Sequence, residues 1–167
     1  MSRKLPKSIK QEEFFALVKK TRKNDKQARL AFILAFGAGM RLSETLHVKA
    51  EDIDEERKSI LIREGKGSKD RVVPLPKGWR SEMKAWLPIK KSARSLERNF
   101  KIAARRAKLN QDYTFHSLRH GFATRCIEAG VPINQVQLLL GHSNVSTTSI
   151  YIQANPTDAL KKYEELF

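Results

Sequence analysis

The sequence predicts a mainly α-helical domain with a small antiparallel β-sheet, an α+β fold. Apolar residues recur at helical spacing through most of the chain. Two short runs, 59–63 and 71–75, are rich in Ile, Leu and Val, and glycines and lysines lie between them, which is typical of a β-hairpin. A chain of 167 residues without a repeat or a flexible linker can bury one core, so a single domain over 1–167 is expected.

The N-terminal part is predicted to form three helices. The first starts at a capping box that begins with Ser8 and ends near Thr21. Its apolar stripe contains Phe14, Phe15 and Val18. The second helix, 26–36, is nearly all apolar and is expected at the centre of the core. Glycines in 37–39 end it, and a short third helix starts within 40–44.

Further helices are predicted beyond the hairpin. A helix over 79–87 is expected to place its tryptophans in the core, and Ser92 is expected to cap a longer helix that ends at Lys108. The buried stripe of that longer helix contains Leu96, Phe100, Ala103 and Ala107. The next helix begins at His116 and ends at Gly130. Its buried residues are expected to be Leu118, Phe122 and Ile127.

The C-terminal part is predicted to contain three short helices. The first covers 131–140 and the second covers 146–152, with a glycine-containing turn between them. The last helix, 155–167, starts at an asparagine cap followed by proline.

Basic residues are unevenly distributed along the chain. It carries 33 basic and 18 acidic residues, a net charge of +15. Residues 77–108 contain 11 basic and 2 acidic side chains, and residues 1–29 contain 10 and 3, whereas the remainder is nearly balanced. A solvated basic face is the simpler explanation, but this density favours a polyanion such as nucleic acid as partner. The expected backbone contacts on the 92–108 helix are Arg94, Arg98, Lys101, Arg105 and Arg106.

The composition also bears on compartment and redox chemistry. The longest apolar run, 30–40, is eleven residues long, too short to span a bilayer, so no membrane partner is expected. The single cysteine, Cys126, cannot form an internal disulfide and lies beside Phe122 on the apolar side of its helix, which favours a core residue over a reactive thiol. The cytoplasm is the expected compartment, with association with the nucleoid in a prokaryote.

Candidate phosphate-binding residues lie in one predicted helix. His116, Arg119 and His120 stand at i, i+3 and i+4 near its N-terminus, where the helix dipole favours an anion.

Two further candidates lie earlier in the chain. Arg41 follows the most buried segment directly, although an ordinary exposed arginine explains it equally well. Lys66 stands between two glycines, which leave the backbone free to approach a phosphodiester. The spacing of an ATP-binding loop is absent.

Four ordered blocks of sequence together resemble the tyrosine recombinases, also called phage integrases, including Xer-like proteins. The blocks are GMRLSE at 39–44, GKGSKDR at 65–71, HSLRH at 116–120, and LGH at 140–142 followed nine residues after His142 by Tyr151. The likeness covers 6–163. It implies the catalytic-domain fold of DNA breaking-rejoining enzymes, without the N-terminal core-binding domain that family members usually carry.

The resemblance also implies roles for these residues. Arg41 and Arg119 would hold the non-bridging oxygens of the scissile phosphate, and Tyr151 would be the nucleophile. His116 would accept the tyrosine proton, and His142 would donate a hydrogen bond to the phosphate.

Supporting roles follow from the same likeness. Lys66 would be the general acid for the leaving 5′ hydroxyl, and Lys69 is the less favoured candidate from the same hairpin. Glu44 and His120 would orient Arg41 and the pocket. Lys69 and Arg71 are further expected DNA contacts.

The implied reaction is strand cleavage and rejoining through a 3′-phosphotyrosyl intermediate. Because this link conserves the bond energy, neither ATP nor a metal is expected as cofactor. Self-association as a dimer or tetramer on DNA is expected, with the 155–167 helix packed either on a neighbouring protomer or on its own core.

Three alternatives remain open at this stage. His116, His120 and His142 could ligate zinc, but Ser117 stands where a zinc protease motif has glutamate, and Arg119 opposes a dication. The segment 132–152 also resembles a helix-turn-helix, which would make the chain a DNA-binding regulator without chemistry. The same catalytic groups could instead relax supercoils, as in type IB topoisomerases.

Overall fold

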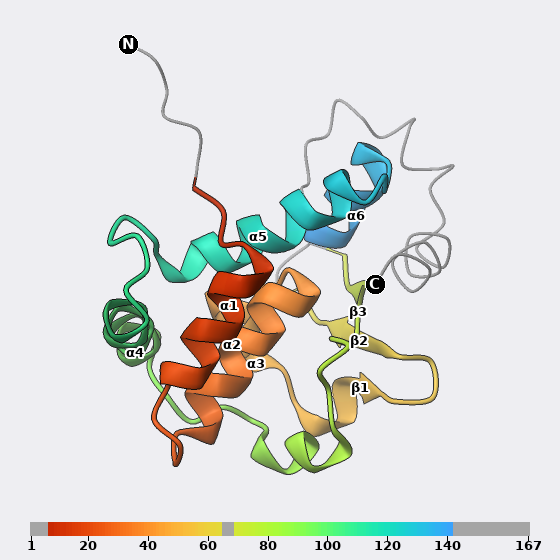
Figure 1. Ribbon diagram of the computed structural model, residues 1–167. Helices are drawn as coiled ribbons and strands as arrows, with labels where there is room; N and C mark the ends of the chain where they lie inside the picture. The colour runs from red at the N-terminus through yellow and green to blue at the C-terminus, as the bar shows by residue number, and fades with distance from the viewer. Residues whose placement is uncertain (1–6, 65–68, 142–167) are drawn as a thin grey trace.

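The computed structural model describes residues 7–64 and 69–141 (Figure 1). Helices gather around α2 (Lys26–Ala38), and a three-stranded antiparallel sheet lies at one side, so the predicted α+β class is confirmed. The predicted helices 146–152 and 155–167 lie outside the described residues, as do Lys66, His142 and Tyr151.

Helix α1 (Gln11–Lys20) begins two residues later than its predicted cap implies. The backbone N–H of Lys10 donates to Oε2 of Glu13 at 2.9 Å, so these residues, and not a box starting at Ser8, form the cap. Phe14 is buried, whereas Phe15 is 60% exposed, so its predicted place in the stripe is wrong. Successive helical residues point about 100° apart, which turns Phe15 to solvent when its neighbour faces the core.

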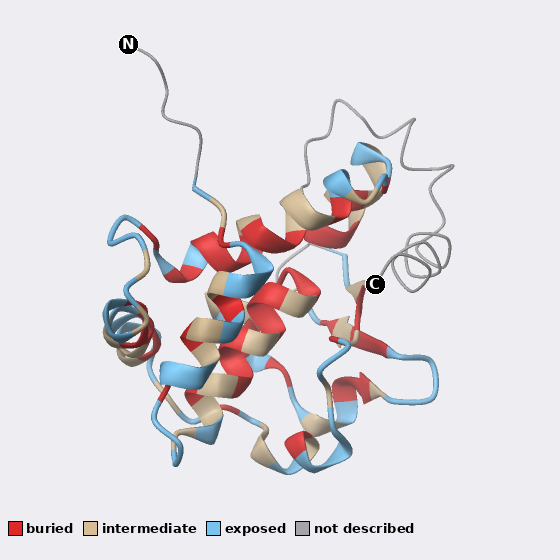
Figure 2. Cartoon of the chain, in the orientation of Figure 1, coloured by how far each residue is buried: buried red, intermediate tan, exposed pale blue. Residues whose placement is uncertain are grey.

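Helix α2 (Lys26–Ala38) forms the centre of the core, as predicted (Figure 2). Asp25 caps it by accepting a hydrogen bond from the Ala28 N–H at 3.0 Å. The helix ends at Gly39, whose φ of +68° suits glycine. A Cβ at Gly39 would lie 2.5 Å from a ring carbon of Phe122 on α5 (Phe115–Glu128), so the chain passes directly against α5 before it enters α3 (Leu42–His47).

The predicted hairpin is confirmed as β2 (Ser59–Ile62) and β3 (Arg71–Pro74). A short strand that sequence patterning did not indicate, β1 (Ile53–Asp54), follows the 3-10 helix η1 (Ala50–Asp52) and pairs with β2. Two residues are too few to show alternation, which is why patterning missed β1. The strand order is β1-β2-β3.

The predicted 79–87 helix is shorter in the structure, where η2 (Ser81–Trp86) is a 3-10 helix. Both tryptophans pack partly buried against the core, as expected. Helix α4 (Ala93–Arg106) begins at the predicted Ser92 cap, whose Oγ accepts from Ser95 N–H at 3.1 Å. Its stripe matches the prediction except that Ala104 is buried and Ala107 is half-buried.

Helices α5 (Phe115–Glu128) and α6 (Ile133–Leu140) pack together around a smaller apolar cluster. Its members are Phe122, Cys126, Val131, Val136, Leu139 and Leu140. The predicted burial of Ile127 is wrong: it is 49% exposed, because the adjacent Cys126 faces the cluster. Burial raises the pKa of the Cys126 thiol to about 12. Among the described helices, none combines the length and hydropathy needed to cross a membrane.

Candidate active site

The site starts with a local contact at the beginning of α3. Glu44 lies in the first turn of α3 and reaches back to Arg41, the residue that precedes the helix. The Arg41 backbone N–H donates to Oε2 of Glu44 at 2.7 Å, and Arg41 Nη1 donates to Oε1 at 3.0 Å. The Arg41 side chain is 39% exposed and that of Glu44 is 9% exposed, so the guanidinium faces solvent from a buried carboxylate.

Arg71 at the start of β3 binds the same carboxylate from the interior. Its Nη1 and Nη2 donate to Oε1 and Oε2 of Glu44 at 2.8 and 2.9 Å, respectively. The same Nη1 also donates to Glu64, and Nε donates to the Leu139 carbonyl at 2.9 Å. The sequence places Arg71 among the DNA contacts, whereas the structure buries its side chain to 8% exposure. The reason is that α3 and α6 together offer it acceptors that satisfy a guanidinium.

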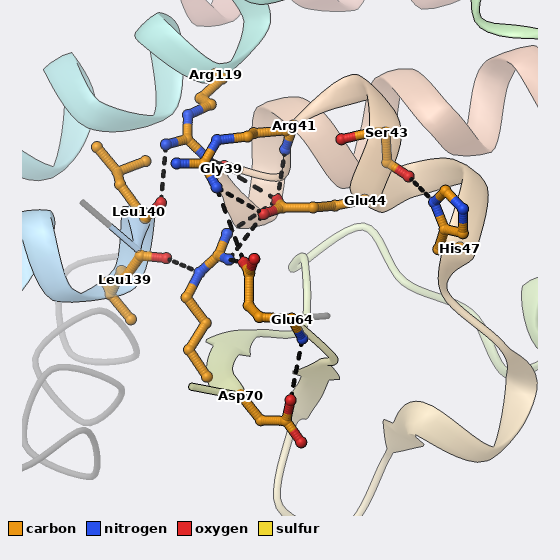
Figure 3. A network of polar contacts seen from close by, with 11 residues as sticks. Gly39, Arg41, Ser43, Glu44, His47, Glu64, Asp70, Arg119, Leu139 and Leu140 are labelled. Carbon is orange, nitrogen blue, oxygen red and sulfur yellow. Dashed lines mark hydrogen bonds and ion pairs between the residues drawn. The ribbon is translucent and has the colours of Figure 1, made fainter. Parts of the chain in front are cut away.

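Arg119 on α5 reaches the cluster from the third side (Figure 3). It is buried, its Nη1 donates to the Gly39 carbonyl at 2.9 Å, and its Nη2 donates to the Leu140 carbonyl at 2.8 Å. Its Nη1 also lies 3.9 Å from Oε2 of Glu44. Arg119 thus joins the end of α2 to the end of α6. Burial and the nearby charge of Arg41 lower its pKa to about 10, so it stays protonated at neutral pH.

Counted over the described residues, the cluster has three guanidinium groups and two carboxylates, Glu44 and Glu64, and therefore carries an excess positive charge of one. Burial by itself would raise the pKa of Glu44, but hydrogen bonds and charges from Arg71 and Arg41 outweigh it and hold that pKa at about 2. Glu44 is therefore ionised at neutral pH. A partly buried site with a net positive charge and an exposed guanidinium suits an oxyanion such as phosphate.

Two histidines lie beside this cluster on α5. His116 is exposed and His120 is half-buried, and their rings meet edge to face with centroids 4.4 Å apart. Burial, and then the charge of Arg119, lower the pKa of His120, which favours its neutral form at pH 7. The three predicted residues of this helix therefore divide between two environments, with Arg119 buried in the cluster and the two histidines at more exposed positions of α5.

The structure thus brings Arg119 of α5 together with Arg41 and Glu44 at the start of α3, a segment far away in the sequence. Lys66, His142 and Tyr151 lie outside the described residues. Two described residues that stand next to the undescribed segments 65–68 and 142–167 belong to the cluster. Glu64 binds Arg71. Gly141, at a φ of +69°, packs so closely on Arg71 that a Cβ at this glycine would lie 2.9 Å from Cδ of Arg71.

Sequence reasoning did not single out Glu64, and it did not indicate that the Arg71 side chain is buried against Glu44. The available signal was an acidic residue immediately before the basic hairpin tip and an arginine immediately before Val72 and Val73. Neither pattern reveals a partner 27 residues away, such as Glu44 for Arg71.

The predicted contacts on α4 lie on the surface, apart from the site cluster. The five basic residues of this set are exposed, although Lys101 also donates from Nζ to the carbonyls of Gln111 and Tyr113. On the hairpin, Lys69 is exposed. A cavity of about 290 Å³ between α4 and the α1–α2 turn is lined by four basic residues and one carboxylate, that of Asp25. The basic residues are Lys20, Arg22, Arg98 and Arg106.

Comparisons with known proteins agree with this fold. The model of the phage integrase family matches residues 7–158. The chain is 38% identical to the tyrosine recombinase XerA of Thermococcus kodakarensis, over 98% of this chain and 63% of that protein. A crystal structure of XerA recombinase is similar with a TM-score of 0.71 and 25% identity, covering 96% of this chain and 64% of that one.

A crystal structure of the XerH site-specific recombinase bound to its palindromic difH substrate, in a post-cleavage complex, is also similar. Its TM-score is 0.71 and its identity is 28%, over 89% of this chain and 50% of that one. The fold is therefore that of a tyrosine recombinase catalytic domain. The chain belongs to the phage integrase family. It spans less than two thirds of the length of these relatives.

Proposed function

We propose that this chain is the catalytic domain of a site-specific DNA recombinase that cleaves and rejoins DNA through a 3′-phosphotyrosyl intermediate. The observation that carries the proposal is the meeting of Arg41 and Arg119 at Glu44, where a preorganised cluster has one excess positive charge. Phosphoryl transfer depends mainly on positioning and on stabilising the charge of the transition state, and this cluster offers both.

The proposed first step forms one bond and breaks another at a DNA phosphorus. The Tyr151 hydroxyl attacks the phosphorus and its proton passes to His116, while the 5′ oxygen leaves and takes a proton from Lys66. Arg41 and Arg119 hold the non-bridging oxygens, and His142 donates a further hydrogen bond. In the reverse chemistry a 5′ hydroxyl attacks the phosphotyrosine and releases Tyr151. Each step exchanges one ester for another, so the proposal requires no ATP.

Double-stranded DNA is the proposed substrate. The exposed basic residues of α4 and the cation-lined cavity beside Arg98 and Arg106 support it, because such groups neutralise backbone phosphates. The similar XerH structure holds a difH substrate. Assembly on DNA as a dimer or tetramer is proposed as well, with the 155–167 segment as the contact between protomers. Its apolar residues Leu160, Tyr163 and Phe167 recur at near-helical spacing.

The test uses a duplex with a nick close to the cleavage position, so that the short product diffuses away and the covalent intermediate accumulates. Wild-type protein is expected to form an adduct, and peptide mapping is expected to place the oligonucleotide on Tyr151. The Tyr151→Phe variant is expected to bind the duplex with unchanged affinity and to form none. Survival of the adduct in this variant would refute the assignment of Tyr151.

Two assays separate the remaining alternatives. Exchange between two target sites on one plasmid is expected of a recombinase. Supercoil relaxation without exchange would instead indicate activity of the type IB topoisomerase kind. Duplex binding by the wild type without any adduct would indicate a regulator without chemistry.

A further inference from the structure

We infer that Arg71 is a positioning residue, which holds Glu44 and thereby leaves the Arg41 guanidinium oriented and available for the phosphate. The inference rests on the proposed function, because it assigns a task to a residue beside the proposed phosphate site. It replaces the DNA contact that the sequence suggested for Arg71 with an indirect action through Glu44.

The contacts of Glu44 give the first step. Arg71 binds both carboxylate oxygens, at 2.8 and 2.9 Å, in a two-bond arrangement that fixes the plane of the carboxylate. The same oxygens accept from Arg41, from Nη1 at 3.0 Å and from the backbone N–H at 2.7 Å. The position of the Arg41 side chain therefore depends on a carboxylate whose orientation Arg71 determines.

The remaining contacts of Arg71 give the second step. Its Nε binds the Leu139 carbonyl at 2.9 Å, its Nη1 binds Glu64, and its side chain packs against Gly141. One side chain thus connects the base of the hairpin, α3 and the last turn of α6. With 8% of the side chain exposed, Arg71 is closed to a duplex, whereas the 39% exposed Arg41 is open to one.

Charge gives the third step. With Arg71 present, three arginines face two glutamates and the cluster keeps an excess of one positive charge. Without Arg71, two arginines would face two glutamates and the excess would vanish. Glu44 would then compete with the phosphate for Arg41, because a buried carboxylate that loses one partner binds the other more strongly. Lysine would restore the charge but not the two-bond geometry.

Three variants test the inference. Arg71→Gln removes the charge and the fork, and Arg71→Lys restores only the charge. Arg63→Gln is the matched control, because Arg63 also pairs with a buried carboxylate at 2.8 Å, that of Asp52, at the end of the neighbouring strand β2, and no contact joins it to Glu44. Thermal unfolding, duplex affinity, and cleavage of a nicked duplex at saturating DNA are measured for each.

We expect Arg71→Gln to bind the duplex within about 3-fold of wild type and to cleave it about 100-fold more slowly at saturation, since misplaced catalytic groups cost about that much. Arg71→Lys is expected to recover about 10-fold of this loss, and Arg63→Gln to cleave like wild type. A wild-type cleavage rate in Arg71→Gln would overturn the inference. A loss of duplex affinity without a loss of cleavage at saturating DNA would also overturn the inference, if the slope of log affinity against log salt falls by the amount of about one phosphate contact. That behaviour is expected of a residue that contacts DNA directly.

A further readout does not depend on cleavage. The carboxyl carbon of Glu44, labelled with ¹³C and assigned with the Glu44→Gln variant, is titrated with acid in free protein. Its midpoint is expected to rise in Arg71→Gln and to stay in place in Arg63→Gln, and an unchanged midpoint in Arg71→Gln would overturn the inference. The Glu44 titration tests the role of Arg71 even when wild type forms no covalent adduct with DNA. The absence of an adduct would count against the proposed function and not against the role of Arg71. If Arg71→Gln does not fold, Arg71→Lys decides: slow cleavage at wild-type affinity supports the inference, and wild-type cleavage refutes it.

Discussion

Arg71 and Glu44, 27 residues apart in the sequence, form a two-bond ion pair with N···O distances of 2.8 and 2.9 Å, and both side chains are less than a tenth exposed. This pair connects the β-hairpin with α3. Arg119 makes the complementary connection, from α5 to the ends of α2 and α6, through the carbonyls of Gly39 and Leu140. Two buried arginines therefore connect five elements at the site: the hairpin, α2, α3, α5 and α6.

Glu44 is expected to make stability depend on pH in the acid range. Its pKa is lowered from 4.5 to about 2, so its contribution is complete above about pH 4.5 and is lost as the pH falls toward 2. The difference corresponds to about 3 kcal/mol. In urea unfolding from pH 5.5 to 2.5, the stability advantage of wild type over Glu44→Gln is expected to shrink. A constant difference for Glu44→Gln would contradict the prediction.

Arg119→Lys is expected to separate binding from chemistry. The substitution keeps the charge but loses the two carbonyl bonds, so unfolding free energy is expected to fall by about 1–3 kcal/mol and cleavage at saturating DNA to fall at least about 100-fold. Duplex affinity is expected to stay near wild type because the α4 contacts remain.

The control for that experiment lies on the same helix. Arg125 binds the Phe36 carbonyl through Nη2 at 2.6 Å, away from Glu44. Arg125→Lys is expected to lose stability without losing cleavage. Equal loss of cleavage in both variants would show that the Arg119 effect is general destabilisation.

The basic surface of α4 is expected to determine the salt dependence of DNA binding. Arg98→Gln and Arg106→Gln are each expected to reduce the slope of log affinity against log salt by about 0.9, as for one phosphate contact. Cleavage at saturating DNA is expected to stay unchanged. Arg57→Gln is the control, since Arg57 lies in the β1–β2 turn with 85% of its side chain exposed. Arg57→Gln is expected to keep the wild-type slope. The assignment of this surface fails if Arg98→Gln and Arg106→Gln keep the wild-type slope as well.

Cys126 is expected to be inert in the folded protein. It is fully buried, and burial raises the pKa of its thiol to about 12, so little thiolate forms at neutral pH. A disulfide-exchange reagent is expected to label it only after urea unfolding, with the labelling yield read by absorbance. Rapid stoichiometric labelling of the native protein would contradict this burial.

Two errors in predicting burial came from neighbouring positions on helices. Phe15 and Ile127 are apolar residues that stand one position from buried ones, at Phe14 and Cys126. A pattern of apolar residues cannot rank two adjacent candidates, because the 100° between them is within the width of the apolar face. The direction of the face is fixed by what packs against the helix.

The candidate Glu44 came from the resemblance to the tyrosine recombinases. The sequence by itself determined the α+β class, the hairpin, the approximate bounds of the described helices, the cap at Ser92, and the candidates Arg41 and Arg119. These depend on local physics: periodicity, capping and spacing act within a few residues. Lys66, His142 and Tyr151 were likewise identified from sequence and keep their proposed roles. Only the tertiary structure decided that Arg71 belongs inside the cluster, that Glu64 joins it, and that Arg119 binds two backbone carbonyls. Those contacts form between segments whose meeting depends on the packing of α2, α5 and α6, so no local pattern along the chain encodes them.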